Sequence, residues 1–258
     1  MLNTLATGSG PTLVWAHGLM YSMQFESQTG WFHPLKDDGI QRLRFDARGH
    51  GLSPVGNGMQ DYLWSAQATD MLNVARHQTF APIALGGQSM GSAAALLAAL
   101  QRPHEVTCLI LATPPCFWQS RPLQVQRYRQ MQRLLQQRGI DSLIALAKRY
   151  PALPAWLLEA RPEHAKAALQ AMRQMSQDSL MDMLEAACQC DLPPPDSLSA
   201  LQIPTLILAW RDDPIHPLHS AEQLAAKLPQ AQLQVIDNAA QLADWPQQIS
   251  NFVLQHAG

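Results

Sequence analysis

The chain has 258 residues, 47% of them hydrophobic and 15% charged, and its formal net charge at pH 7 is −2. This composition is typical of a folded globular protein long enough to bury a full core, and it excludes a disordered chain. The weak net charge argues against nucleic acid or an anionic membrane surface as a partner.

The first 115 residues alternate between strand and helix patterns. Continuous apolar runs are what strands covered on both faces require, and they predict strands at 12–16, 43–46, 83–85 and 106–111. Apolar residues at helical spacing predict a helix over 61–77, and an Ala- and Leu-rich run predicts another over 92–101. Strands that alternate with helices favour a mostly parallel sheet with helices on both faces.

The alternation stops after residue 115. Residues 117–191 carry only helical signals, and three consecutive prolines at 193–195 form a stiff joint after them. The predicted organisation is an α/β core interrupted by a helical cap that is inserted after the sixth core strand. Its expected parts are residues 1–115 for the first part of the core, 116–199 for the cap and 200–258 for the second part of the core.

Strand and helix patterns resume near the C-terminus. Strands are predicted at 205–210 and 233–236, with a helix between them. A last helix is expected from about Asp244, because Asp244 and Gln247 suit a capping box and Pro246 suits a first turn.

Neither targeting nor metal signals stand out. No apolar run reaches the roughly 20 residues that cross a bilayer, and residues 1–10 lack the pattern of a secretory signal. The sequence therefore predicts a cytoplasmic protein. Cys188 and Cys190 form a Cys-x-Cys pair without a second pair of ligands, which favours incidental thiols over a metal site. No cofactor motif is present, and the oligomeric state does not follow from the sequence.

A G-x-S-x-G sequence is the strongest functional signal. Ser89 lies between Gly87 and Gly91, directly after a predicted strand and directly before a predicted helix. In such a strand–turn–helix the serine occupies a strained turn and serves as a nucleophile. The start of the helix presents unpaired N–H groups, including that of Met90, which suit a developing oxyanion. Glycine-serine turns without chemistry also occur at such places.

Further motifs resemble the α/β-hydrolase superfamily, in particular carboxylic-ester hydrolases and enol-lactonase-like proteins. They are Trp-Ala-His-Gly-Leu at 15–19, Asp-Ala-Arg-Gly-His-Gly-Leu-Ser at 46–53, and Trp-Arg-Asp-Asp-Pro-Ile-His-Pro at 210–217. The resemblance implies the α/β-hydrolase fold and structural roles for His17 and His50. It also implies Asp213 as the acid of a triad, and the backbone N–H of Leu19 or Met20 as the partner of Met90 in an oxyanion hole.

The histidine that the resemblance implies after the last strand is absent. Ala240 and Gln241 occupy that place, and a glutamine has no useful basicity. Losing the histidine of a working triad costs on the order of 10⁶ in turnover. His216, three residues after Asp213, is the best substitute base, and His219 is a weaker one.

Two classes of function remain open. The first is a serine hydrolase that acts on a small, mostly apolar ester, thioester or lactone, with Ser89, Asp213 and His216 as its triad. The second is a degenerate member that binds a small ligand, or catalyses a non-hydrolytic step, without a triad. A third explanation of Gln241 is an introduced change in an active parent, which the accompanying Ala240 disfavours.

Overall fold

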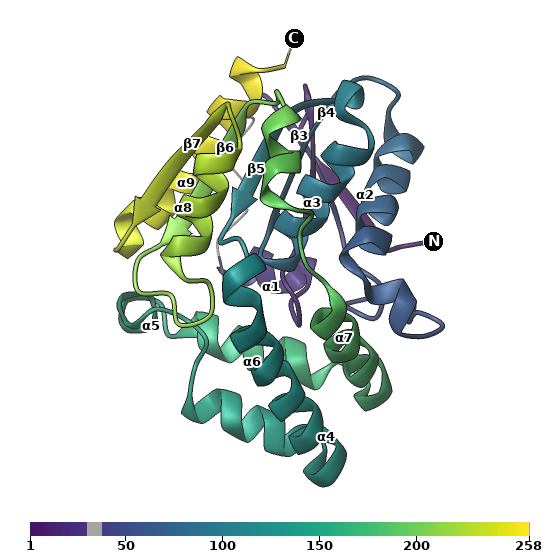
Figure 1. The fold of residues 1–258 in the computed structure, drawn as a ribbon, viewed down its shortest axis with the longest axis vertical. Coiled ribbons are helices and arrows are strands. Elements are labelled where there is room, and N and C mark those ends of the chain that lie inside the picture. The colour runs from purple at the N-terminus through teal and green to yellow at the C-terminus, as the bar shows by residue number, and fades with distance from the viewer. Residues whose placement is uncertain (30–37, 258) are drawn as a thin grey trace.

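The computed structural model describes residues 1–29 and 38–257, which form one layer of strands between helices (Figure 1). The described strands form a seven-stranded sheet in the order β1-β3-β2-β4-β5-β6-β7. Only β1 runs antiparallel to its neighbour, and the other pairs are parallel. The strands are β1 (Thr4–Thr7), β2 (Thr12–Ala16), β3 (Gln41–Phe45), β4 (Ile83–Gln88), β5 (Val106–Ala112), β6 (Thr205–Trp210) and β7 (Ala231–Ile236).

The central strands are buried on both faces, as their apolar runs predicted. Every residue of β2, β4 and β6 is buried. Successive side chains of a strand point to opposite faces. Accordingly, Val14 packs in the cluster with α2 (Trp64–Gln78), α3 (Met90–Gln101) and α8 (Leu218–Lys227). Trp15 packs in the cluster on the other face, with α9 (Ala239–Gln255). The predicted parallel sheet with helices on both faces is confirmed.

A helical insertion follows β5 and lies at one end of the sheet (Figure 1). It follows the fifth strand of this chain and not a sixth, because the single edge strand β1 is all that precedes β2. Its helices are α4 (Arg121–Arg149), α5 (Ala155–Ala160), α6 (Glu163–Arg173) and α7 (Gln177–Gln189). Gly139, at φ 73° and ψ 178°, divides α4 into two helical arms. The insertion has an apolar cluster of its own, which includes Leu135, Leu143 and Leu180.

The N- and C-terminal parts of the core depart from the sequence expectations. Strand β1 and the short helix α1 (Met23–Thr29) were not predicted. The final helix begins at Ala239, not near Asp244, because the side chain of Asn238 caps it by accepting the N–H of Gln241. Pro246 therefore lies inside α9.

The 3₁₀ helices are η1 (Met59–Tyr62), η2 (Pro103–Glu105), η3 (Trp118–Ser120) and η4 (Pro195–Ala200). None of the helices in the described residues is long and apolar enough to cross a membrane.

Candidate active site

Ser89 occupies a sharp turn between β4 and α3. Its backbone lies at φ 51° and ψ −114°, a left-handed conformation that is strained for any residue other than glycine. The flanking glycines make the turn fit. A Cβ on Gly87 would lie 2.6 Å from the carbonyl oxygen of Ala16, and a Cβ on Gly91 only 2.0 Å from the same atom. The two glycines therefore let α3 start directly against β2, with the Ser89 side chain raised above the sheet.

The loop after β6 places an acid and an imidazole next to Ser89. Nδ1 of His216 lies 2.9 Å from Oδ2 of Asp213, and Nε2 lies 2.8 Å from Oγ of Ser89. An ionised carboxylate only accepts hydrogen bonds, so Nδ1 carries the proton and Nε2 is left to accept the serine hydroxyl. This is the connectivity of a nucleophile, a general base and an orienting acid.

The acid is held by its own turn and is shielded from solvent. Oδ1 of Asp213 accepts the backbone N–H groups of Ile215 at 2.9 Å and of His216 at 3.0 Å. Its side chain is fully buried, and that of His216 is 9% exposed. One carboxylate therefore fixes both the backbone of the loop and the ring that the loop carries.

The resemblance implied that the backbone N–H of Met90 and that of Leu19 or Met20 would hold an oxyanion. The N–H of Met90 is the first of α3, and the first N–H groups of a helix have no partner within it. After β2, the N–H of Met20 is 3.3 Å from Nε2 of His50 and is committed to it. The N–H of Leu19 is the other donor that the resemblance implied.

His17 and His50 tie the loop after β2 to the loop after β3. Nε2 of His17 accepts the N–H of Ala47 at 3.0 Å, and Nε2 of His50 accepts the N–H of Met20 at 3.3 Å. Both rings are 1% exposed. Burial lowers the pKa of His17, and it lowers the pKa of His50 from 6.5 to about 3. Both rings are therefore neutral structural acceptors at pH 7, as the motifs predicted.

The family follows from comparison with known proteins. A family model described as serine aminopeptidase, S33, matches residues 10–240. The chain belongs to this family. The 3-oxoadipate enol-lactonase 2 of Acinetobacter baylyi is 22% identical over 237 residues, which cover 91% of this chain and 83% of that protein.

Solved structures of low identity show the same fold as this S33 family member. The enol-lactonase of Burkholderia xenovorans has a TM-score of 0.82 at 17% identity and covers 98% of this chain and 96% of its own. A malate-bound thermophilic esterase of Thermogutta terrifontis has a TM-score of 0.81 at 23% identity and covers 98% and 92%. The α/β-hydrolase fold that the motifs predicted is confirmed.

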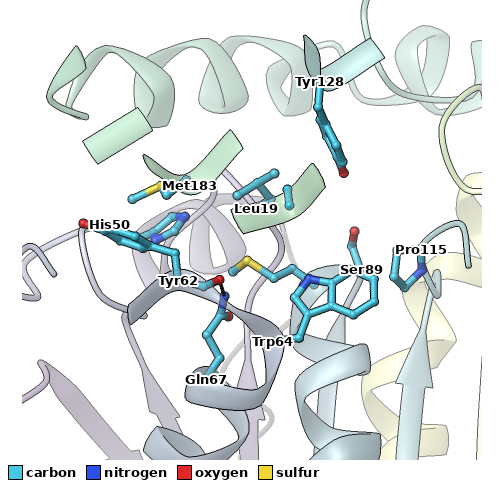
Figure 2. Close-up of a pocket in the computed structure, with 11 residues that line it drawn as sticks. Leu19, His50, Tyr62, Trp64, Gln67, Ser89, Pro115, Tyr128 and Met183 are labelled. Carbon is cyan, nitrogen blue, oxygen red and sulfur yellow. Dashed lines mark hydrogen bonds between the residues drawn. The ribbon is translucent and has the colours of Figure 1, made fainter. Parts of the chain in front are cut away.

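A cavity opens beside Ser89, underneath the insertion. The space between its lining side chains is about 360 Å³ when open solvent is counted, and only a small part of it is wide enough for a water molecule. Trp64, at the start of α2, and Leu19 supply apolar walls. Tyr128 of α4 and Met183 of α7 reach in from the insertion, and the hydroxyl of Tyr128 points toward that of Ser89 (Figure 2).

The sequence reasoning missed several side chains of this cavity. Tyr62 and Gln67 line it together with Trp64, although the pattern of 61–77 indicated only a helix packed on the core. Tyr62 accepts the N–H of Gly56, and Gln67 donates to the carbonyl oxygen of Tyr62. The available signal was an aromatic and an amide side chain near Trp64, just before and within the first turn of α2.

Gln241 and the weaker candidate base, His219, are both exposed. Gln241 is exposed in the first turn of α9, where its Oε1 accepts the N–H of Asp237 at 3.1 Å. His219 has a 66% exposed side chain that faces Glu222 at 3.9 Å.

The sulfur of Cys190 accepts the backbone N–H of Trp64. In residues 1–29 and 38–257, no group of three or more His, Cys, Asp or Glu side chains is placed to hold a metal ion.

Proposed function

We propose that the chain is a serine hydrolase that acts on a small, mostly apolar ester, thioester or lactone. Ser89 is the nucleophile, His216 the general base, and Asp213 the acid that orients it. One observation carries the proposal: the imidazole of His216 lies within hydrogen-bond distance of both the Ser89 hydroxyl and the Asp213 carboxylate.

The geometry supports acyl transfer in two steps. Ser89 Oγ attacks the carbonyl carbon of the substrate while Nε2 of His216 takes the hydroxyl proton. The N–H groups of Leu19 and Met90 hold the resulting oxyanion, and Asp213 stabilises the imidazolium. The tetrahedral intermediate expels the alcohol or thiol, which takes the proton from His216. Water activated by the same nitrogen then attacks the acyl-serine and releases the acid and the free hydroxyl.

The cavity supports the proposed substrate class. Leu19, Trp64 and Met183 offer apolar surface beside Ser89, which suits a mostly apolar compound. An esterase and enol-lactonases share the fold, which agrees with an ester or lactone without identifying either.

Gln241 bears on the alternative, a degenerate hydrolase that only binds a ligand. The alternative rested on the missing histidine at this place. Gln241 is exposed and its side chain caps the entry to α9, which is a structural role of its own. With His216 beside Ser89, an exposed glutamine at the start of α9 is compatible with an active enzyme.

Covalent labelling with a fluorophosphonate, followed by intact mass, tests the proposal. The wild type should gain one adduct, and Ser89→Ala should gain none. His216→Ala should label at least about 10⁴-fold more slowly, because it removes the base. His219→Ala, which alters an exposed histidine in α8, is the matched control and should label like the wild type. An unlabelled wild type, or normal labelling of His216→Ala, would contradict the proposed function.

A further inference from the structure

The loop that carries Asp213 and His216 is held by side chains of the insertion. Nε1 of Trp156, in α5, donates to the carbonyl oxygen of Arg211 at 3.1 Å. The guanidinium of Arg127, in α4, donates to the carbonyl oxygen of Pro214 at 3.2 Å. These two bonds fall on either side of the acid, one before Asp213 and one directly after it.

This loop contains a strained residue that the surroundings must hold. Asp212 has φ 58°, a left-handed conformation in which a non-glycine residue is uncommon. On its N-terminal side, the N–H of Arg211 is anchored to the carbonyl oxygen of Ile236 at the end of β7. The carbonyl group of Arg211 is anchored by Trp156. Strained conformations persist only where such contacts over-determine them, and releasing one lets the loop relax.

The side chains of Trp156 and Arg127 are held by contacts of their own. The ring of Trp156 packs edge-on against Trp210, with centroids 6.3 Å apart, and Trp210 stacks on Trp245 of α9 at 6.2 Å. The donating nitrogen of Arg127 also lies 3.3 Å from Oε1 of Gln124, one turn earlier on α4. Trp156 thus connects the insertion to both the end of β6 and the last helix.

We infer that Trp156 and Arg127 are positioning residues for His216, so that the insertion sets the geometry of the acid–base loop as well as covering the cavity. The inference rests on the proposed function and adds to it. Neither side chain lies among the residues that line the described cavity, so both act through the loop carbonyls. Because the acid and the base share one short loop, a shift of that loop moves both relative to Ser89.

The rate of fluorophosphonate labelling reports how well His216 is positioned beside Ser89. A displacement of about 1 Å in a catalytic group can cost about 100-fold in rate. Removing one of the two bonds should therefore slow labelling by about tenfold, and removing both by about 100-fold.

The variants keep the packing and remove only the donors. Trp156→Phe retains an aromatic ring against Trp210, and Arg127→Met retains the stem. Arg127→Lys restores a donor and should recover part of the lost rate. The readouts are the fluorophosphonate labelling rate, the melting temperature, and the proton NMR signal of the imidazole N–H shared with Asp213, which should broaden or shift when the loop relaxes.

Two matched controls remove similar contacts away from the loop. Trp118→Phe loses an indole bond to the carbonyl oxygen of Pro193, 2.8 Å long. Arg129→Met loses an ion pair with Glu185, within the insertion. Both controls should lose as much melting temperature as the test variants and keep the wild-type labelling rate and NMR signal.

The outcomes distinguish the inference from the proposed function. If Trp156→Phe and Arg127→Met label like the wild type while Ser89→Ala and His216→Ala are inactive, the inference is wrong and the proposed function stands. Equal slowing in test and control variants would also overturn it, since the loss would then reflect general destabilisation. Normal labelling of His216→Ala would overturn both.

Discussion

Acid should weaken the fold through His50. The ring is 1% exposed, and burial lowers its pKa from 6.5 to about 3. In the unfolded chain His50 binds a proton below pH 6.5, whereas in the folded chain it stays neutral down to about pH 3. The unfolded state thus binds more protons between these values, and the free energy of unfolding falls as the pH drops. The slope is about 1.4 kcal/mol per pH unit, which amounts to about 2 kcal/mol between pH 7 and pH 5.

Urea unfolding of the wild type and of His50→Gln at a series of pH values measures this contribution. The glutamine can still accept the N–H of Met20 but does not titrate. The difference in unfolding free energy between the two proteins should narrow by about 2 kcal/mol from pH 7 to pH 5. His219→Gln, which removes an exposed histidine, should leave the pH dependence of the wild type intact. Parallel curves for the wild type and His50→Gln would refute the argument that burial keeps His50 neutral.

Three further results are expected. Gly91→Ala should lower the melting temperature and slow fluorophosphonate labelling more than tenfold. The new Cβ would lie 2.0 Å from the carbonyl oxygen of Ala16, and such overpacking costs about 1–3 kcal/mol or more. A stable variant that labels like the wild type would contradict the tight turn. Gln241→His should label within about twofold of the wild type, since position 241 is exposed on α9 and His216 is the proposed base. Burial raises the pKa of Glu26 from 4.5 to about 8. Between these pH values the carboxyl is ionised in the unfolded chain and protonated in the folded chain, so the free energy of unfolding falls as the pH rises from 4.5 to 8. Glu26→Gln should therefore raise the free energy of unfolding at pH 7 by up to about 3 kcal/mol and at pH 4 by nearly nothing, and a gain of equal size at both would contradict a protonated Glu26.

The sheet and the serine turn were predictable because their signals are local. The strands at 12–16 and 205–210 are continuous apolar runs, and β2 and β6 have these bounds. Ser89 lies between a strand and a helix in the sequence itself, and its left-handed backbone follows from that turn. By contrast, β1 consists of four exposed residues, Thr4–Thr7, whose only strand signal is their pairing with β3.

Other features depend on distant contacts and could not be predicted in full. His216 and Ser89 are 127 positions apart, and their bond depends on a loop conformation that the sequence does not encode locally. The sequence indicated only that both follow strands of one sheet. The bond from the N–H of Met20 to the ring of His50, which bears on the choice between Leu19 and Met20 as a donor, is another distant contact. The predicted start of α9 was wrong because Asp244 and Gln247 resemble a capping box. The helix is capped instead by Asn238, six residues before Asp244.

Asp213 and His216 are only three positions apart in the sequence, so the fold needs fewer contacts between distant segments to place both of them. Their mutual geometry is encoded by four consecutive residues and closed by bonds within that segment. The tertiary structure then has to align only one segment with Ser89. An acid and a base on two separate loops would each have to be aligned independently. Such a segment is modular: it could be grafted after the corresponding strand of another α/β scaffold as one piece.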